Sequence, residues 1–352
     1  MSGDTRPVRA SEQLDWSRIE AYLRDALPQH PTARMLVEQF PGGHSNLTYL
    51  LRFGDFEAVL RRPPFGPVPP RAHDMARECR VLSAVHPHFP LAPRPLLLCE
   101  DAAVAGFTFY VMERRRGIVL RLEEPPQVHD QPEVRRAISE AVVDTLVDLH
   151  GIDITATGLV ALGKPEGFVA RQIRGWTERW NASKTSDVPE MEQLARWLDC
   201  RIPPDPPRPA MVHGDYKLDN VMLAEDDPRR LVAVFDWEMS AVGDPLVDLG
   251  ILLCYWVHVA KAAPGDAISM ITIAPGWFGR SQILNRYAMR SHASLDRIAL
   301  YEVFAVFKLA VVIQQIYARY VRGQTDDLRF ASMGDRVTLL ARKAASMAEE
   351  FA

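Results

Sequence analysis

Long apolar runs, closely spaced cysteines and an excess of basic residues are all missing from this sequence. Its four cysteines are widely scattered and form no CxxC pair, which favours reduced packing residues over a disulfide framework or a zinc site. The net charge of −4 gives no overall basic field, so we expect neither nucleic acid nor a membrane among the partners. The nearest approach to a membrane span, Tyr301 to Tyr320, is interrupted by charged residues and falls short of the roughly 20 apolar residues that a span requires.

What is present has the composition of an ordinary globular protein. Apolar residues make up 47% of the chain and charged residues 24%. A chain of 352 residues is too long for one compact core and suggests two domains, or one large bilobal domain. The first residues are polar and do not resemble a signal peptide, so we expect a cytoplasmic location.

The first third of the chain is rich in strand patterns, and the remainder is mainly helical. Gly54 and Asp55 are typical of a turn that joins two strands into a hairpin, and a helix is predicted from about His73 to Val85. From about Glu133 apolar residues recur at helical spacing. We therefore predict a small strand-rich lobe followed by a larger helical lobe. The predicted strands are 47–53, 56–60, 95–99 and 107–112.

The segment HGDYKLDN, residues 213 to 220, concentrates ionisable and amide side chains between two apolar runs. A surface turn needs only a glycine and one Asp or Asn. Polar groups held in a short loop between ordered elements are instead typical of a functional site. Taken alone, the segment is also compatible with a hairpin rich in turn-forming residues.

Sixteen residues after Asn220, the run LVAVFDWE brings an apolar strand pattern to Asp236. An acid at the end of such a strand is costly unless a cation or a hydrogen-bond donor meets it. Asp215, Asn220 and Asp236 follow one another as in nucleotide-dependent phosphoryl transferases: an Asp accepts the proton of the substrate hydroxyl, then an Asn and an Asp hold Mg²⁺. Amide and carboxylate oxygens suit Mg²⁺, which is a hard cation.

Three segments together resemble the aminoglycoside phosphotransferase family, which has the protein-kinase-like fold. HGDYKLDNVM is similar to its catalytic loop, VFDWEMSAVGDPLVDLG to its metal-binding segment, and FPGGHSNLTYLLRF to its nucleotide-covering hairpin. The chain is most similar to the branch found as the kinase-like domain of some acyl-CoA dehydrogenase family proteins. The resemblance implies an α+β, bilobal fold with an antiparallel-sheet N-terminal lobe, residues 1–115, and a mainly helical C-terminal lobe, residues 116–352.

The resemblance also implies a site for ATP or GTP and Mg²⁺. Asp215 is then the catalytic base, Lys217 is placed to meet the γ-phosphate, and Asn220 and Asp236 are the Mg²⁺ ligands. The other implied residues contact the nucleotide. They are Gly42, Gly43, His44, Ser45 and Asn46 in the loop over the phosphates, Arg61 with Glu78 as the phosphate-binding pair, and Glu113 to Arg115 at the hinge, where the backbone meets adenine.

Arg61 is a departure from the protein-kinase pattern, which has Lys on this strand. Arginine is always charged and binds phosphate through two hydrogen bonds, so the electrostatic role survives the change. The family branch that the chain resembles commonly has Arg here. Arg62 is an alternative for the same contact, and an ordinary surface ion pair between Arg61 and Glu78 is an alternative explanation of the pattern.

Residues that flank these motifs are expected to have supporting roles. His213 is expected to pack under the loop and donate to its backbone, and Asp248 to accept from that backbone. Asp244 suits the beginning of a helix. Trp237 and Glu238 are expected to face the acceptor.

The leading hypothesis is a Mg²⁺- and ATP-dependent kinase that acts on a hydroxyl of a small molecule. A nucleotide-binding pseudokinase is an alternative, as is a true aminoglycoside-modifying kinase. A metallohydrolase is disfavoured because the ten histidines show no metal-ligand spacing. The sequence does not fix the oligomeric state.

The charge of the helical region favours one class of acceptor. Between Ser281 and Gly323, six basic residues stand against two acids. That balance disfavours a polycation such as an aminoglycoside and favours a neutral or anionic hydroxy compound, for example a hydroxyacid or its thioester. A solvated charged helix face is the alternative explanation. The residues counted are Arg286, Arg290, Arg297, Lys308, Arg319 and Arg322 against Asp296 and Glu302.

Overall fold

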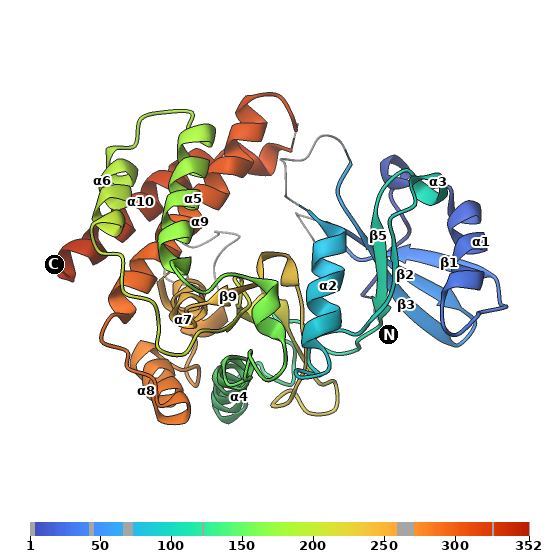
Figure 1. Ribbon diagram of the computed structural model, residues 1–352, viewed down its shortest axis with the longest axis horizontal. Helices are drawn as coiled ribbons and strands as arrows, with labels where there is room; N and C mark the ends of the chain where they lie inside the picture. Colours follow the sequence, from blue (N-terminus) through green and yellow to red (C-terminus); the bar gives the residue numbers. More distant parts are fainter. Residues whose placement is uncertain are drawn as a thin grey trace. The chain divides into compact units, whose positions relative to one another are not determined.

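The computed structural model describes residues 4–41, 46–65, 73–121, 123–258, 271–325 and 327–351. The chain divides into two compact units (Figure 1). The first comprises the chain as far as Ile118 together with the segments Met222–Glu225 and Val232–Glu238, and the second comprises the rest. The sequence alone assigns all of 116–352 to one lobe, whereas these two short segments pack with the first unit.

An antiparallel sheet of five strands forms the centre of the first unit, in the order β1-β2-β3-β5-β4. Gly54, with a φ of 61°, makes the turn from the second strand to the third. The predicted strands 47–53 and 95–99 are confirmed to the residue, and the other two differ by at most two residues at either end. The strands are β1 (Met35–Gln39), β2 (Leu47–Phe53), β3 (Phe56–Arg62), β4 (Pro95–Cys99) and β5 (Phe109–Glu113).

Three helices accompany this sheet: α1 (Trp16–Ala26), α2 (Met75–Val85) and the short α3 (Ala102–Ala105). Helix α1 buries Ile19 and Leu23 against Leu60 of β3 in one apolar cluster. Helix α2 begins after Asp74, whose carboxylate accepts the backbone N–H of the third helical residue. The predicted helix at 73–85 is therefore confirmed, apart from its first two residues.

The second unit is mainly helical. Its long helix α9 packs against α5, α7 and α10 and is mostly buried. By length and mean hydropathy α9 could cross a membrane, but 83% of its apolar window is buried within the protein, as in a core helix. The helices are α4 (Pro132–His150), α5 (Phe168–Ser183), α6 (Pro189–Asp199), α7 (Leu246–Leu253), α8 (Arg280–Ser291), α9 (Ile298–Val321) and α10 (Met333–Glu350), and a π-helical turn (Cys254–His258) continues α7.

Two short pairs of strands, of which β6–β9 is antiparallel, hold the loops that carry the sequence motifs. Strand β6 (Ala210–Val212) pairs with β9 (Ala241–Gly243), and β7 (Val221–Leu223) pairs with β8 (Leu231–Val234). HGDYKLDN thus connects β6 to β7, and Asp236 follows β8. The expected α+β class, with a small antiparallel sheet and a larger helical part, is confirmed.

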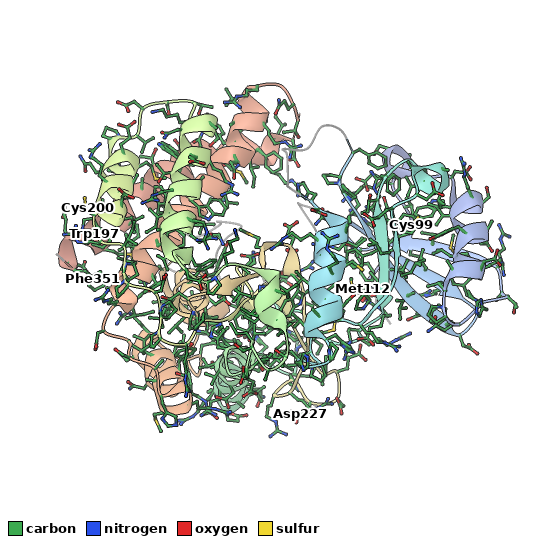
Figure 2. The ribbon with its side chains drawn as sticks, in the orientation of Figure 1. Cys99, Met112, Trp197, Cys200, Asp227 and Phe351 are labelled. Atoms are coloured by element: carbon green, nitrogen blue, oxygen red, sulfur yellow. The ribbon has the colours of Figure 1, made fainter. Side chains whose placement is uncertain are left out.

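All four cysteines are free thiols, as expected. Cys79, Cys99 and Cys254 are buried and fill space. Cys200 is exposed just after α6, so it is not the packing residue that the sequence suggested. Figure 2 shows Cys99 in the first unit and Cys200 in the second.

Candidate active site

Three of the predicted site residues meet in the loop between β6 and β7. The Asp215 carboxylate oxygen Oδ2 lies 3.0 Å from the Lys217 ammonium and accepts the amide N–H of Asn220 at 3.0 Å. The same Asn220 amide donates to the Asp215 carbonyl at 2.9 Å. A short 3₁₀ turn, Leu218–Asn220, brings the asparagine back to the aspartate. The Asp215 side chain is 18% exposed, so it is fixed but accessible.

The backbone of this loop is held by a buried carboxylate. Asp248 accepts the N–H of His213 at 2.6 Å and that of Gly214 at 2.7 Å, as expected from the sequence. Burial acts to raise the pKa of Asp248, but His150, His213 and the backbone N–H of Gly214 together outweigh it, and the pKa is lowered. Asp248 therefore stays ionised and can accept all of these bonds.

Gly214 is required by the shape of the loop. Its φ is +83°, and a Cβ atom at this position would lie 2.4 Å from the Met239 carbonyl oxygen. His213, which is fully buried, accepts the N–H of Asp215 through Nδ1 at 3.2 Å. In this contact the ring nitrogen is the acceptor, and the expected donation from His213 to the loop backbone stays a prediction. Asp244, by contrast, accepts the N–H of Leu246 at the beginning of α7, as expected.

Lys217 is a half-buried ammonium with several charged and aromatic neighbours. Besides Asp215 it approaches the Asp219 carboxylate at 4.0 Å, and it lies 4.7 Å from the ring centre of Tyr255 on the π-helical turn. Burial opposes its charge, but the neighbouring carboxylates favour it, and its pKa lies well above the ordinary value. Burial raises the pKa of Asp219, whose Oδ1 has no hydrogen-bond partner within the described part of the chain.

The remaining predicted charges meet in the first unit. Arg61 of β3 donates from Nε to Glu78 of α2 at 3.1 Å and from Nη2 to Asp236 at 2.5 Å. Burial opposes the charge of Arg61, yet the carboxylates of Glu78 and Asp236 hold its pKa well above the ordinary value. Asp236 has a φ of +67°, which is strained for a residue with a side chain and is typical of functional positions. The ion pair is largely buried and is not the surface pair considered as an alternative.

The structure also decides between the two adjacent arginines. Arg62 points to the opposite face of β3, where its guanidinium carbon lies 3.9 Å from the ring centres of both Phe65 and Phe107. Side chains alternate along a strand, so only one of the two arginines can face Glu78. Arg61 is the arginine that meets Glu78 and Asp236.

Glu238 is a site residue whose contacts the sequence did not predict. Its carboxylate accepts the side-chain amide of Asn46 at 2.9 Å, and its carbonyl accepts from Arg77 of α2 at 2.8 Å. His73 completes the group with a 2.8 Å hydrogen bond to the Asn46 oxygen. Trp237 is buried and donates to the Val234 carbonyl at 2.8 Å. Both residues thus make contacts within the first unit, and the expectation that they face an acceptor stays a prediction.

The loop and hinge assignments are only partly covered. Gly42, Gly43, His44 and Ser45 lie outside the described residues. At the end of β5, the Glu113 carboxylate accepts the backbone N–H of Arg94, and the Glu113 N–H donates to the Arg94 carbonyl. The guanidinium of Arg115 forms an ion pair with the same Glu113 carboxylate. The side chains of both hinge residues are therefore occupied by their neighbours, and their backbone contact with adenine stays a prediction.

Two groups of candidate residues result, one on each unit. Asp215, Lys217 and Asn220 belong to the second unit; Arg61 and Asp236, with Glu78 and Asn46, belong to the first. In the described ranges no three His, Cys, Asp or Glu side chains form a metal-binding cluster. This finding does not test Asn220, because an amide oxygen is outside that set.

Comparison with known proteins places these features in a family. A model of the phosphotransferase enzyme family (APH) matches residues 36–280. The chain is 32% identical to mouse (Mus musculus) acyl-CoA dehydrogenase family member 10, over 99% of this chain and 32% of that protein. It thus spans about a third of the length of this relative.

Solved structures show the same fold. A Ralstonia eutropha protein provisionally assigned as an aminoglycoside phosphotransferase has a TM-score of 0.80 and 30% identity, covering 96% of this chain and 99% of that one. A thermostable mutant of aminoglycoside phosphotransferase APH(4)-Ia, in a ternary complex with ADP and hygromycin B, has a TM-score of 0.55 and 16% identity, covering 88% and 94%. The second likeness bears on the fold alone. The resemblance found in the sequence is confirmed.

Proposed function

The chain belongs to the APH phosphotransferase enzyme family, and from that premise we propose that it transfers the γ-phosphate of ATP to a hydroxyl group of a small molecule. The observation that carries the proposal is the Asp215 carboxylate, which Lys217 and Asn220 hold at 3.0 Å each. A general base must be fixed in position and reachable by its substrate, and Asp215 meets both conditions.

In the proposed reaction Asp215 accepts the proton of the acceptor hydroxyl. The hydroxyl oxygen forms a bond to the γ-phosphorus while the bond from that phosphorus to the β,γ-bridging oxygen breaks, and ADP leaves. Lys217, beside the base, offsets negative charge on the transferred group. Arg61 binds the phosphates of the nucleotide, and Glu78 orients its guanidinium.

Asn220 and Asp236 are the proposed Mg²⁺ ligands. The N–H groups of the Asn220 amide are directed at Asp215, so the oxygen is the atom that remains for a cation. Asp236 adds a carboxylate whose Oδ1 is held by Arg61. This all-oxygen donor set fits Mg²⁺, which when bound neutralises charge on the phosphates.

An acceptor that is neutral or anionic is the second part of the proposal. Lys217 lies half-buried beside Asp215 at the catalytic loop, and the buried Lys308 binds the Gly214 carbonyl of the same loop. The basic residues between Ser281 and Gly323 support this part of the proposal less than their number suggests. Arg286 and Arg290 of α8 are already paired with Asp144 of α4. The name of the mouse relative refers to acyl-CoA chemistry, which makes a hydroxyacyl thioester one acceptor to test.

The proposal is tested by Asp215→Asn. The variant should lose about 10²- to 10⁴-fold in transfer rate, the usual contribution of a general base, while nucleotide affinity stays close to that of the wild type. ATP consumption with and without a panel of alcohols, sugars, hydroxyacids and aminoglycosides measures the first quantity, and ADP titration the second. ATP affinity that falls in parallel with turnover would count against Asp215 as the base.

A further inference from the structure

Lys308 is a buried lysine for which the proposed mechanism has no use. It lies in the middle of α9, within an apolar stretch, and is 8% exposed. Burial lowers its pKa. An ammonium removed from water carries a large desolvation cost, and an apolar side chain of similar length would fill the same space without it. Packing alone therefore does not explain a lysine at this position.

The contacts of Lys308 are directed at the catalytic loop. Its ammonium donates to the Gly214 carbonyl at 2.5 Å and lies 5.3 Å from the ring centre of Trp176 on α5. The carboxylates of Asp215 and Asp248 are the charges that favour the ammonium most. The lysine thus connects the core helix of the second unit to the residue before the proposed base.

Both polar groups of the peptide bond between Gly214 and Asp215 are hydrogen-bonded. Lys308 binds its carbonyl oxygen, and His213 accepts its N–H through Nδ1 at 3.2 Å. On the other side of Gly214, Asp248 accepts the preceding N–H at 2.7 Å. The carbonyl of the next peptide, that of Asp215, accepts from the Asn220 amide at 2.9 Å. Because the peptide planes on both sides of the Asp215 Cα are held, the direction in which its side chain leaves the backbone is held as well.

We propose that Lys308 is a positioning residue, which holds the Gly214–Asp215 peptide so that the Asp215 carboxylate is aimed at the acceptor hydroxyl. The expected effect of Lys308 on catalysis rests on the proposed function. Its effect on the structure of the loop rests only on the contacts described above. Lys308 touches neither nucleotide nor acceptor in this account, so its loss affects the chemical step and leaves ATP binding intact.

The test compares Lys308→Met with Gln314→Met. Gln314 lies on the same helix, is also buried, and donates to the Ser183 carbonyl at 2.9 Å, away from the catalytic loop. Lys308→Met thus loses the bond to the Gly214 carbonyl, and Gln314→Met loses the bonds to the Ser183 carbonyl and the Thr185 hydroxyl. Lys308→Met should lower kcat about 10- to 100-fold, as expected for a misdirected catalytic group, with the KM for ATP unchanged. Gln314→Met should leave both values near those of the wild type.

Hydrogen exchange of the backbone at residues 213–220 supplies a readout that does not require an acceptor. Exchange there should be faster in Lys308→Met and unchanged in Gln314→Met, because only the first loosens the loop. If Lys308→Met does not fold, Lys308→Gln takes its place, since it keeps a neutral donor; it should show a smaller kcat loss in the same direction.

Two results would overturn the inference: loop exchange equal to that of the Gln314→Met control, or a kcat equal to that of this control. A wild-type protein that phosphorylates no acceptor would count against the proposed function. In that case the exchange comparison still decides whether Lys308 holds the loop.

Discussion

Arg61 and Arg62 are neighbours in sequence with different environments, because side chains alternate along β3. Arg61 donates to Asp236, whereas Arg62 stacks between two phenylalanine rings. We predict that Arg61→Ala lowers kcat/KM for ATP about 10- to 100-fold, since a hydrogen bond to a charged group contributes roughly 1.5–3 kcal/mol. Arg61→Lys should recover part of the loss, because it keeps the charge without the forked geometry. Initial rates over a range of ATP concentrations measure both effects.

Arg62→Ala is the matched control for this prediction. It should change kcat/KM for ATP less than about threefold while lowering the thermal midpoint, because the cation–π contacts with Phe65 and Phe107 contribute about 1–2 kcal/mol. Equal kinetic losses in the Arg61 and Arg62 variants would show that the phosphate contact has been misassigned.

Asp236 and Asn220 are predicted to set the Mg²⁺ dependence of the reaction. Asp236→Ala should raise the Mg²⁺ concentration for half-maximal rate by about tenfold or more, because it removes a charged ligand. Asn220→Ala should raise it less and be rescued in part by high Mg²⁺. Asp227→Ala is a suitable control, since Asp227 pairs only locally with Arg229 in the β7–β8 connection (Figure 2). If the Mg²⁺ titration curves of Asp236→Ala and Asn220→Ala both coincide with the wild-type curve, these two residues are not the Mg²⁺ ligands.

Helix α9 is tied to two neighbouring elements by one buried carboxylate. Glu302 accepts from Arg280 of α8, with contacts of 2.6 to 3.0 Å, and lies 2.6 Å from Nε2 of His258 on the π-helical turn. Burial acts to raise the pKa of Glu302, but the bonds from His258 and Arg280 outweigh it, and the pKa falls below the ordinary value of 4.5.

The lowered pKa makes a prediction about stability and pH. Because the folded protein binds the proton less tightly than the unfolded chain, Glu302 stabilises the fold above about pH 4.5, and this stabilisation is lost as pH falls through the lower folded pKa. Glu302→Gln should therefore cost about 2–3 kcal/mol near neutral pH, toward the low end for a buried pair because Arg280 is 35% exposed. Urea unfolding from neutral pH down to about pH 3 should show the two proteins converging.

Glu178→Gln is the control for this measurement, since Glu178 is exposed on α5. It should leave the unfolding free energy nearly unchanged at every pH. Parallel curves for the wild type and Glu302→Gln, without convergence in acid, would mean that Glu302 is not ionised as its contacts indicate.

Local patterns explain which elements could be predicted from the sequence. Strands β2 and β4 and helix α2 have clear turn, capping or periodic signals, and their predicted bounds agree with the structure. Strand β1 was not predicted, because Leu36 is exposed and the burial along the strand does not alternate cleanly. The π-helical turn has no local signal in the sequence; it continues α7 and packs against α9.

In the candidate site, too, only the contacts that have a local signal could be predicted from the sequence. Asp215, Asn220 and Asp248 lie in recognisable segments, so their contacts within the loop could be anticipated. Glu238 bonds Asn46 across 192 residues of sequence, and Lys308 bonds Gly214 across 94. Such contacts arise from packing. The only trace of Lys308 in the sequence is a lone cation within an apolar helix, where the cost of burial points to a specific partner.

The charge around the catalytic loop also determines which acceptors the molecule can bind well. A polycation needs carboxylates that are free to meet it. In the described part of the second unit, the buried acids near the loop are already engaged: Asp248 by loop backbone, Asp244 by Tyr301 and Glu302 by Arg280. The basic residues of α8 are engaged too. The charges that remain at the loop are Lys217 and Lys308 with Asp215 and Asp219, and both of these acids already face Lys217.

We therefore predict that anionic acceptors are phosphorylated more efficiently than neutral ones, and aminoglycosides least. The measurement is kcat/KM for a hydroxyacid or hydroxyacyl thioester, a neutral alcohol of matched size and a kanamycin-type aminoglycoside, at low and at physiological salt. The anionic acceptor should exceed the aminoglycoside by at least about tenfold at low salt, because complementary charge raises the rate of encounter. Screening should narrow this difference at higher salt, whereas a difference due only to pocket shape would not respond. Efficient aminoglycoside turnover at physiological salt, or resistance conferred on a sensitive host, would reverse the assignment and make an antibiotic-modifying kinase the better description.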